Sequence, residues 1–321
     1  MRAPGFYFQP PGLASALLSP FGTIYGVVAA ARMRRPGARA GVPVICVGNP
    51  TLGGAGKTPA ALALAQMLAA MSERPFFLSR GYGGSEAGPL LVDPARYTAA
   101  EVGARDRVAG AKLAVEQGAS VLVLDDGFQN PSLVKDCALL VVDRTRGIGN
   151  GRMFPAGPLR APLDVQLALA QGIVLVGDGD AANFVAKRAA AFKLPLFPAK
   201  LIPDAAAAAK FSGKKLLAFA GIGHPEKFFA TLAALGADVA ETRSFPDHHR
   251  YSVREAQSLV SDANARGLTL VTTEKDLVRM QGDPALAELA ASFHVLPVRL
   301  QFEDEDAVRD LLKRTLVKAR A

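Results

Sequence analysis

A glycine-rich segment that ends in Gly56, Lys57 and Thr58 has the residue types needed to hold a nucleotide. It follows an apolar run at 43–49 and precedes a helical pattern, which is the strand–loop–helix order of a phosphate-binding loop. Glycines let backbone N–H groups point at phosphate oxygens, while the lysine reaches the β- and γ-phosphates and the threonine hydroxyl serves Mg²⁺. We therefore predict nucleotide binding here rather than a structural glycine turn, although Thr51 stands where the strict pattern has glycine.

Two adjacent carboxylates, Asp125 and Asp126, end a second apolar run, SVLVLDDG at 120–127. An acid at a strand end beside a phosphate loop is where a Walker-B-type residue holds Mg²⁺. A solvated strand end is the alternative, but the phosphate loop favours a metal or catalytic role. Two acids also allow two tasks, since one can hold the metal while the other positions or activates a nucleophile.

Four further clusters combine polar side chains with strand ends or glycines. RGYGG at 80–84 is typical either of a loop that contacts an anion or of a plain turn. The arginines of the long loop at 143–160 could grip a phosphorylated substrate. FPDHHRYS at 245–252 suggests one histidine in acid–base or orienting work, or a solvated loop, and TTEKD at 272–276 suggests a hinge or a contact of a second domain.

The elements that must position these residues alternate along the chain. Near-continuous apolar runs predict strands buried on both faces of a parallel sheet. They lie at 43–49, 75–81, 120–127, 137–143, 172–177, 215–223, 238–245, 269–276 and 294–300. Helical patterns lie between several of them, at 59–71, 107–117, 226–236 and 253–265. This alternation predicts βαβ units and a doubly wound α/β fold with a mostly parallel sheet.

Length and composition limit the class of protein. The chain has 321 residues, half of them apolar and 21% charged, which predicts about two globular domains and excludes a disordered chain. Its two cysteines, Cys46 and Cys137, lie in apolar runs, so we expect buried thiols in strands. A disulfide framework and a multi-cysteine zinc site are thereby excluded, and a reducing compartment fits best.

The net charge of +8 favours anionic partners, although ordinary solubility explains it equally well. Nucleic acid is disfavoured as a partner, because the sequence has no lysine-rich tail, no Trp and no aromatic-plus-basic RNA signature.

The segment 3–31 has no charged side chain, and Arg32, Arg34 and Arg35 follow it directly. A membrane-spanning helix needs about 20 consecutive apolar residues. Prolines and glycines divide this segment into two short pieces, LASALLS and FGTIYGVVAAA, and we expect neither to span. Two interpretations remain: a helical hairpin packed on the protein's own core, or an interfacial segment with its arginines on anionic headgroups.

Seven motifs in a fixed order resemble one known family. They are GNPTLGGAGKTP, LSRGYGG, DDGFQNPSL, VVDRTRGIGNGRMFPAGPLR, FAGIGHPEKFF, FPDHHRYS and TTEKD. Together they resemble tetraacyldisaccharide 4′-kinase, the lipid A 4′-kinase of Gram-negative bacteria, from about Phe8 to Phe302. The ordered set is highly specific, whereas a phosphate loop alone is not.

The resemblance implies ATP- and Mg²⁺-dependent phosphorylation of the 4′-hydroxyl of a tetraacyldisaccharide 1-phosphate, which yields lipid IVA. It implies an N-terminal membrane-associating segment at 1–33, a P-loop kinase core at 34–205 and a smaller α/β domain at 206–321. We expect peripheral attachment to the cytoplasmic face of the inner membrane through anionic lipids. No obligate protein partner is evident.

The resemblance also assigns residues. Those that match the ATP loop are Thr51, Leu52, Gly53, Gly54, Ala55, Gly56, Lys57 and Thr58. Asp125 and Asp126 match the acidic pair, and Thr58 and Asp125 are the expected Mg²⁺ ligands. His248 matches a catalytic histidine that the family pairs with a carboxylate. The expected substrate contacts are Arg80, Tyr82, Asn130 and Arg160.

The chain departs from the family pattern at two places. Ala161 stands where a glutamate usually follows the arginine, and a Gly-Asp-Glu-Pro stretch is absent between Gly103 and Ala104. The aspartate that partners the histidine belongs to that stretch. The alternative function is therefore an ATP-binding, membrane-associated P-loop protein with weak or no kinase activity.

Overall fold

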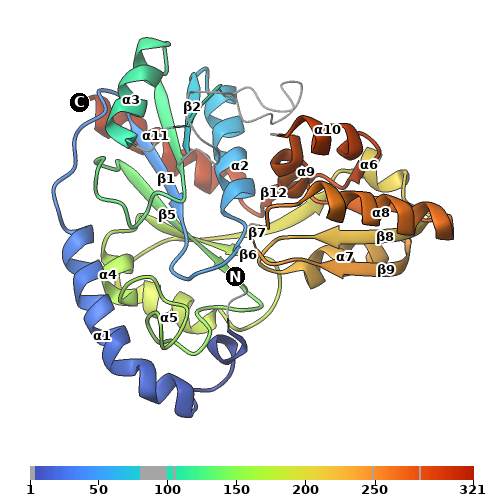
Figure 1. The fold of residues 1–321 in the computed structure, drawn as a ribbon. Helices are drawn as coiled ribbons and strands as arrows, with labels where there is room; N and C mark the ends of the chain where they lie inside the picture. The colour runs from blue at the N-terminus through green and yellow to red at the C-terminus, as the bar shows by residue number, and fades with distance from the viewer. Residues whose placement is uncertain (1–3, 80–99, 104–105, 248, 282) are drawn as a thin grey trace. The chain divides into compact units, whose positions relative to one another are not determined.

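The fold was determined as a computed structural model that describes residues 4–79, 100–103, 106–247, 249–281 and 283–321 (Figure 1). The chain divides into two compact units. The larger contains Ala3–Leu201 and Leu300–Ala321, and the smaller contains Ile202–Arg299.

The larger unit is built on a sheet that, within the described residues, has the strand order β12-β7-β6-β5-β1-β4-β2-β3. Its strands are β1 (Val44–Gly48), β2 (Pro75–Ser79), β3 (Ala100–Gly103), β4 (Val121–Asp125), β5 (Cys137–Asp143), β6 (Gly172–Val176), β7 (Leu196–Pro203) and β12 (Val298–Phe302). The neighbouring strands from β7 to β3 pair in parallel, as the apolar runs predict.

Helices cover both faces of this sheet, which confirms the doubly wound α/β fold (Figure 1). Side chains of α2 (Lys57–Ala70) and α11 (Glu305–Arg320) pack on the face that contains Ile45 and Val47. The opposite face contains Val44 and Cys46 and is covered by α3 (Arg107–Glu116), α4 (Leu163–Ala168) and α5 (Asn183–Ala191). Apolar side chains on alternate faces of one strand thus account for its uninterrupted apolar sequence.

The smaller unit has its own parallel sheet, with the strand order β11-β10-β8-β9 in the described residues. Its strands are β8 (Lys215–Ala220), β9 (Asp238–Ser244), β10 (Thr269–Thr272) and β11 (His294–Val295). Its helices are α6 (Ala205–Ala209), α7 (Pro225–Ala234), α8 (Val253–Arg266), α9 (Glu274–Gln281) and α10 (Pro284–Ala290). Helices α8, α9 and α10 contribute to one apolar core and α6 and α7 to another.

The expected domain at 206–321 is wrong at its C-terminal end. The chain leaves the larger unit within β7 and returns to it within β12, so Leu300–Ala321 belong to the larger unit. The return is driven by burial, because α11 packs Val308, Leu312 and Leu316 into the core around α2.

The expected break in the N-terminal segment is also wrong. After a 3-10 helix, η1 (Gly5–Phe8), a single helix α1 (Leu13–Met33) runs through Pro20, and it is long and apolar enough to cross a membrane by length and composition. The glycines do not break it, because they are contact points. A Cβ on Gly22 would lie 2.9 Å from the carbonyl oxygen of Met153, and one on Gly26 would overlap the Met153 side chain.

Both cysteines are free and buried in strands, as expected. Burial raises the pKa of Cys46 and of Cys137 to about 12, so both remain protonated thiols.

Candidate active site

The phosphate loop and the acidic pair meet at one edge of the large sheet. Strands β1 and β4 are parallel neighbours, and Val47 lies in register with Asp125. Their carboxyl ends therefore release the segment 49–56 and the acidic pair at adjacent positions. This confirms the juxtaposition that the two strand ends predict.

The loop has the backbone conformation that its glycines allow. Gly53 and Gly56 have φ values of 102° and 87°, a left-handed region that residues with a Cβ rarely adopt. Asn49 donates from Nδ2 to the carbonyl oxygen of Gly53 over 3.0 Å and so fixes the start of the loop. Helix α2 begins at Lys57 with no acidic residue in its first turn, so its N-terminal N–H groups suit an anion.

Thr58 and Asp125 form a direct pair, with the hydroxyl donating to Asp125 Oδ2 over 2.6 Å. A hydroxyl at the start of α2 and a carboxylate at the end of β4 are oxygen ligands of the type that Mg²⁺ prefers. The two residues therefore fit the metal role expected for them. Among the described residues, no group of three His, Cys, Asp or Glu side chains could hold a metal alone, so a cation here would need ligands from phosphate or water.

Asp126 lies among positive charges. Its Oδ1 accepts a hydrogen bond from Arg160 Nη1 over 2.7 Å and lies 3.8 Å from Lys57 Nζ. Burial raises the pKa of Asp126, but the charges of Lys57 and Arg160 and the hydrogen bond outweigh burial and hold this pKa below its usual value. The carboxylate is consequently ionised at neutral pH.

The backbone of Asp126 is held in an unusual conformation. Its φ is 54°, a left-handed value that is uncommon for a residue other than glycine. Arg107, a buried residue of α3, donates from Nη2 to the Asp126 carbonyl oxygen over 3.2 Å. Gly127 leaves the room for this guanidinium, because a Cβ there would lie 2.5 Å from Arg107 Nη1.

Arg160 joins the acidic pair to the phosphate loop. The long loop after β5 returns along the phosphate loop, where Leu52 donates to Pro158 over 2.8 Å and Arg160 donates to Pro50 over 2.9 Å through their backbones. The guanidinium Nε of Arg160 also donates to the Thr51 carbonyl oxygen over 2.9 Å. Arg160 was expected to contact substrate, and the structure gives it these intramolecular partners.

Two glutamines that the motifs did not single out support the site. Gln129 donates from Nε2 to the Asn49 carbonyl oxygen over 2.9 Å and to Gln166 Oε1 over 3.0 Å. Gln166 is fully buried and donates to the carbonyl oxygen of Ala161 over 2.7 Å. Gln129 stands within DDGFQN and could have been suspected, whereas neither Gln166 nor Arg107 lies in a recognisable motif.

The remaining predicted residues divide into two groups. Asn130 lies in a turn, where its Oδ1 accepts a hydrogen bond from the Ser132 N–H over 2.9 Å. Arg80, Tyr82 and His248 lie outside the described residues, as does Ala104 on one side of the shortened stretch.

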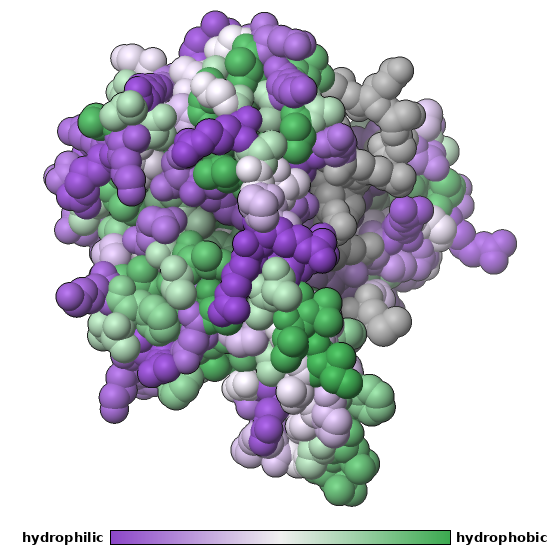
Figure 2. All heavy atoms as spheres, turned by 90° about the vertical axis from the view of Figure 1, so that its left-hand side faces the viewer, coloured by the Kyte–Doolittle hydropathy of each residue, from purple (hydrophilic) through white to green (hydrophobic). Residues whose placement is uncertain are grey.

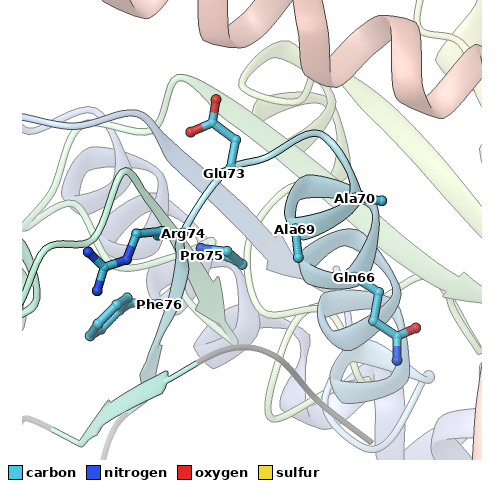
Figure 3. Close-up of a pocket in the computed structure, with 7 residues that line it drawn as sticks. All are labelled: Gln66, Ala69, Ala70, Glu73, Arg74, Pro75 and Phe76. Carbon is cyan, nitrogen blue, oxygen red and sulfur yellow. The ribbon is translucent and has the colours of Figure 1, made fainter.

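A pocket of about 570 Å³ lies at the other end of α2 (Figure 3). It is lined by Gln66, Ala69, Ala70, Glu73, Arg74, Pro75 and Phe76. Figure 3 shows the Gln66 side chain extending from α2 and Glu73 on the connection to β2. Because the phosphate loop precedes α2 and this pocket lies where α2 ends, the pocket is separate from the candidate site.

Comparisons with known proteins agree with the motifs. The family model for tetraacyldisaccharide-1-P 4′-kinase matches residues 14–317. A tetraacyldisaccharide 4′-kinase of Rhodopseudomonas palustris (strain BisB5) is 52% identical over 334 positions, which cover 100% of this chain and 98% of that protein. One of Methylobacterium sp. (strain 4-46) is 54% identical over 322 positions, covering 96% of this chain and 95% of that protein.

A solved structure has the same architecture. The crystal structure of LpxK from Aquifex aeolicus in complex with ATP matches with a TM-score of 0.68 and 26% identity, covering 95% of this chain and 100% of that one. The alignment with the Rhodopseudomonas protein spans 334 positions for a chain of 321 residues, so this chain lacks residues that its relative has.

Proposed function

Because the chain belongs to the tetraacyldisaccharide-1-P 4′-kinase family, we propose that it transfers the γ-phosphate of ATP to the 4′-hydroxyl of tetraacyldisaccharide 1-phosphate. The observation that carries this proposal is the cluster at the edge of the large sheet. Thr58 pairs with Asp125, and Asp126 accepts from Arg160 beside Lys57, all directly after a glycine loop of the phosphate-binding type.

The side chains divide the work of phosphoryl transfer. This reaction needs positioning and charge stabilisation more than covalent chemistry. Lys57 and the N-terminus of α2 supply positive charge to the phosphates. Thr58 and Asp125 would hold Mg²⁺, which neutralises charge on the β- and γ-phosphate oxygens when it is bound.

Asp126 orients the acceptor hydroxyl. A carboxylate whose pKa lies below its usual value is a weak base but a permanent hydrogen-bond acceptor at neutral pH. It therefore aligns the 4′-hydroxyl for attack and takes up its proton late, as the bond to phosphorus forms. His248, which lies outside the described residues, is proposed as a further catalytic residue because it matches the family's histidine.

The surface of α1 supports peripheral membrane attachment. One face of the helix packs on the protein through Ser15, Gly22 and Gly26, whereas the other exposes large apolar side chains. These are Leu13, Leu17, Phe21, Ile24, Val27 and Val28, each at least 62% exposed. Figure 2 shows hydrophobic residues gathered on this side of the larger unit.

Charge adds to this apolar face. Arg32, Arg34 and Arg35 are exposed at the end of α1 and suit anionic headgroups. A helix packed on its own protein along one face and apolar on the other is suited to lie in a membrane surface rather than cross it. The surface proposed is the cytoplasmic side of the inner membrane, where ATP is available.

The kinase assay is the direct test. The purified full-length chain is incubated with radiolabelled ATP, Mg²⁺ and the tetraacyldisaccharide 1-phosphate in detergent micelles, and the lipids are separated by thin-layer chromatography. We expect a labelled bisphosphorylated lipid. ATP binding without any labelled lipid would instead support the alternative of a P-loop protein that has lost kinase activity with the shortened stretch.

Membrane attachment is tested on the exposed face of α1. Phe21→Glu combined with Ile24→Glu should shift the protein away from vesicles containing phosphatidylglycerol in a flotation assay, because two charges enter the apolar stripe. Val317→Glu is the control, since it places a charge on an equally exposed apolar residue of α11. Equal flotation of both variants would contradict the proposed surface.

A further inference from the structure

The TTEKD motif, which the proposed chemistry does not use, surrounds a buried carboxylate in the smaller unit. Asp276 is 0% exposed and accepts three hydrogen bonds. Its Oδ2 accepts from the Gly221 backbone N–H over 2.9 Å and from Thr273 Oγ1 over 2.7 Å. Its Oδ1 accepts from Arg279 Nη1 over 2.8 Å, and the same guanidinium nitrogen donates to the Gly221 carbonyl oxygen over 2.8 Å.

Gly221 is therefore held on both its N–H and its C=O by one ion pair, in which Asp276 is fully buried and Arg279 is largely buried. It directly follows β8, in the FAGIG motif. A Cβ at this position would lie 3.0 Å from Asp276 Oδ1, 3.0 Å from Tyr251 Oη and 3.2 Å from the Cβ of His249. Three motifs that are far apart in sequence thus touch at one glycine.

The third of these motifs is the loop at 245–252, which carries His248. The Phe245 N–H donates to the Ala220 carbonyl oxygen over 2.9 Å, next to Gly221. The His249 ring stacks on Phe245 and meets Tyr251 edge-on, with ring centroids 4.8 Å apart in both cases. His249 Nε2 lies 3.1 Å from Glu255 Oε1 at the start of α8.

TTEKD also reaches this loop directly. Lys275 Nζ lies 3.9 Å from Asp247 Oδ1, so adjacent residues of one motif contact Gly221 and the loop. Burial and the negative charge of Asp276 raise the pKa of Tyr251, which keeps its phenol protonated beside Gly221. The described residues on both sides of position 248 therefore contact Gly221 or residues next to it in space, and Asp276 and Arg279 hold Gly221 in place.

A buried ion pair is a costly way to gain stability, because the charges lose their hydration. Breaking one by removal of a single partner, however, leaves an unpaired buried charge and disturbs everything bonded to it. Here the groups bonded to it are the backbone of Gly221 and, through Gly221, the loop.

We propose that Asp276, with Arg279 as its partner, is a positioning residue that, through Gly221, fixes Phe245, His249 and Tyr251, the described residues that flank position 248. The inference rests on the proposed function for the role of His248 in phosphoryl transfer. The link from Asp276 to the loop itself stands on the contacts alone.

The test compares Asp276→Asn with Asp283→Asn in the full chain. Both variants make the same chemical change in the smaller unit, but Asp283 caps α10 and contacts neither Gly221 nor the loop in the described structure. The ring signals of isotope-labelled histidine are recorded by NMR, with the His249 signal assigned by its loss in His249→Gln. We expect Asp276→Asn to move the His249 signal and Asp283→Asn to leave it unchanged.

Kinetics provide the second readout, at a temperature where thermal unfolding shows each variant to be folded. Displacement of a catalytic group by about 1 Å can cost on the order of 10²-fold in rate. We expect Asp276→Asn to lower kcat by about 10- to 100-fold with the KM for ATP within about twofold of the parent, since ATP is assigned to the other unit. If Asp276→Asn fails to fold, the same two measurements are made on Arg279→Lys. This substitution keeps the positive charge but loses the planar guanidinium that bonds both Asp276 and Gly221.

The two readouts separate the inference from the proposed function. An unmoved His249 signal in the folded variants overturns the link from Asp276 to the loop, whatever the activity. A moved signal with unchanged kcat in an active kinase overturns the positioning role. A parent protein with no kinase activity refutes the proposed function, while the NMR comparison still decides the link.

Discussion

Two segments of this molecule have the same order of strand, glycine turn and helix but differ in how the N-terminus of the helix is capped. In the larger unit, β1 leads through the segment 49–56 into α2, and in the smaller unit, β8 leads through Gly221 and Gly223 into α7. The α7 N-terminus is capped by the His224 side chain, which accepts from the Lys227 N–H, and has Glu226 in its first turn. The α2 N-terminus follows a glycine and has no acid in its first turn.

The difference lies in what satisfies the backbone donors. Asp276 accepts from the Gly221 N–H, so the protein's own carboxylate occupies the position beside this turn. In the larger unit the two nearby carboxylates accept hydrogen bonds from side chains, Asp125 from Thr58 and Asp126 from Arg160. Similar local folds can therefore bind a loop or an anion, depending on whether a carboxylate from another element reaches the glycine turn.

The largest effect should come from Lys57→Ala. The substitution removes the charge that faces both the phosphate loop and Asp126, where Nζ lies 3.8 Å from Oδ1. Loss of one donor that stabilises developing charge typically costs about 10²–10³-fold in kcat. We expect at least this loss in lipid phosphorylation, with far-UV circular dichroism and thermal unfolding close to those of the parent.

The lysine of the other segment is the matched control. Lys227→Ala removes the same charge from the first turn of α7, whose N-terminus is already capped. It should leave turnover within about twofold. Equal losses of turnover in Lys57→Ala and Lys227→Ala would show that the different capping of α2 and α7 does not matter for function.

The next effect separates the two acids. Asp125→Asn should raise the Mg²⁺ concentration needed for half-maximal rate by about 10- to 100-fold, because it removes the negative charge of a proposed Mg²⁺ ligand. Asp126→Asn should lower kcat at saturating Mg²⁺ by about 10²-fold, the lower end of what a positioned proton acceptor contributes, because it removes the ionised acceptor. Titrations of rate against Mg²⁺ distinguish them, and identical Mg²⁺ profiles for the two variants would argue that the acids share one task.

The sequence predicted those parts of the site that depend on local order. Lys57, Thr58 and Asp125 were expected together because the phosphate loop and Asp125 each follow a strand, and parallel strands release the segments after them at one edge of the sheet. Arg160 was placed with the substrate, since nothing in the sequence links it to Thr51, 109 residues earlier. Arg107 and Gln166 were missed for the same reason, as their contacts depend on the packing of distant elements.

Fold prediction failed where tertiary contacts override local preference. Pro20 and Gly22 suggested the end of a helix, yet α1 continues because its glycines let it approach Met153 closely. The return of β12 and α11 to the larger unit could not be foreseen from chain order, since a contiguous domain at 206–321 was the simplest division. Strands β3 and β7 were also not anticipated, whereas the strongly apolar β1, β4 and β5 were.

A smaller effect is expected at the capped helix. His224→Ala removes the acceptor for the Lys227 N–H at the start of α7. Loss of a helix N-cap typically costs about 1 kcal/mol in the free energy of unfolding. Urea denaturation should show this loss, while ATP affinity, measured by calorimetry, should stay unchanged. A weakened affinity for ATP would mean that α7 takes part in nucleotide binding and would remove the contrast with α2.

The smallest effect belongs to the far end of α2, where Arg320 of α11 donates to Glu73 over 2.9 and 2.6 Å. Hydrogen bonds from Arg320 are the largest cause that lowers the pKa of Glu73 below 4.5. A carboxylate with a lowered folded-state pKa stabilises the fold above its unfolded-state pKa and loses that contribution as pH falls through the folded-state value. Because Arg320 is about half exposed, Arg320→Ala should cost less than about 1 kcal/mol at pH 7.

The sign of this effect with pH is what identifies the pair. The difference in unfolding free energy between parent and Arg320→Ala should shrink as the pH is lowered toward about 3, because protonated Glu73 no longer attracts the guanidinium. Arg314→Ala is the control, since it removes the same charge from an exposed position of the same helix. Turnover should be unaffected in both variants, because this contact lies at the end of α2 opposite Lys57. A loss of turnover in Arg320→Ala alone would show that the two ends of α2 are energetically coupled. The Glu73–Arg320 pair could then no longer be treated as independent of the site around Lys57.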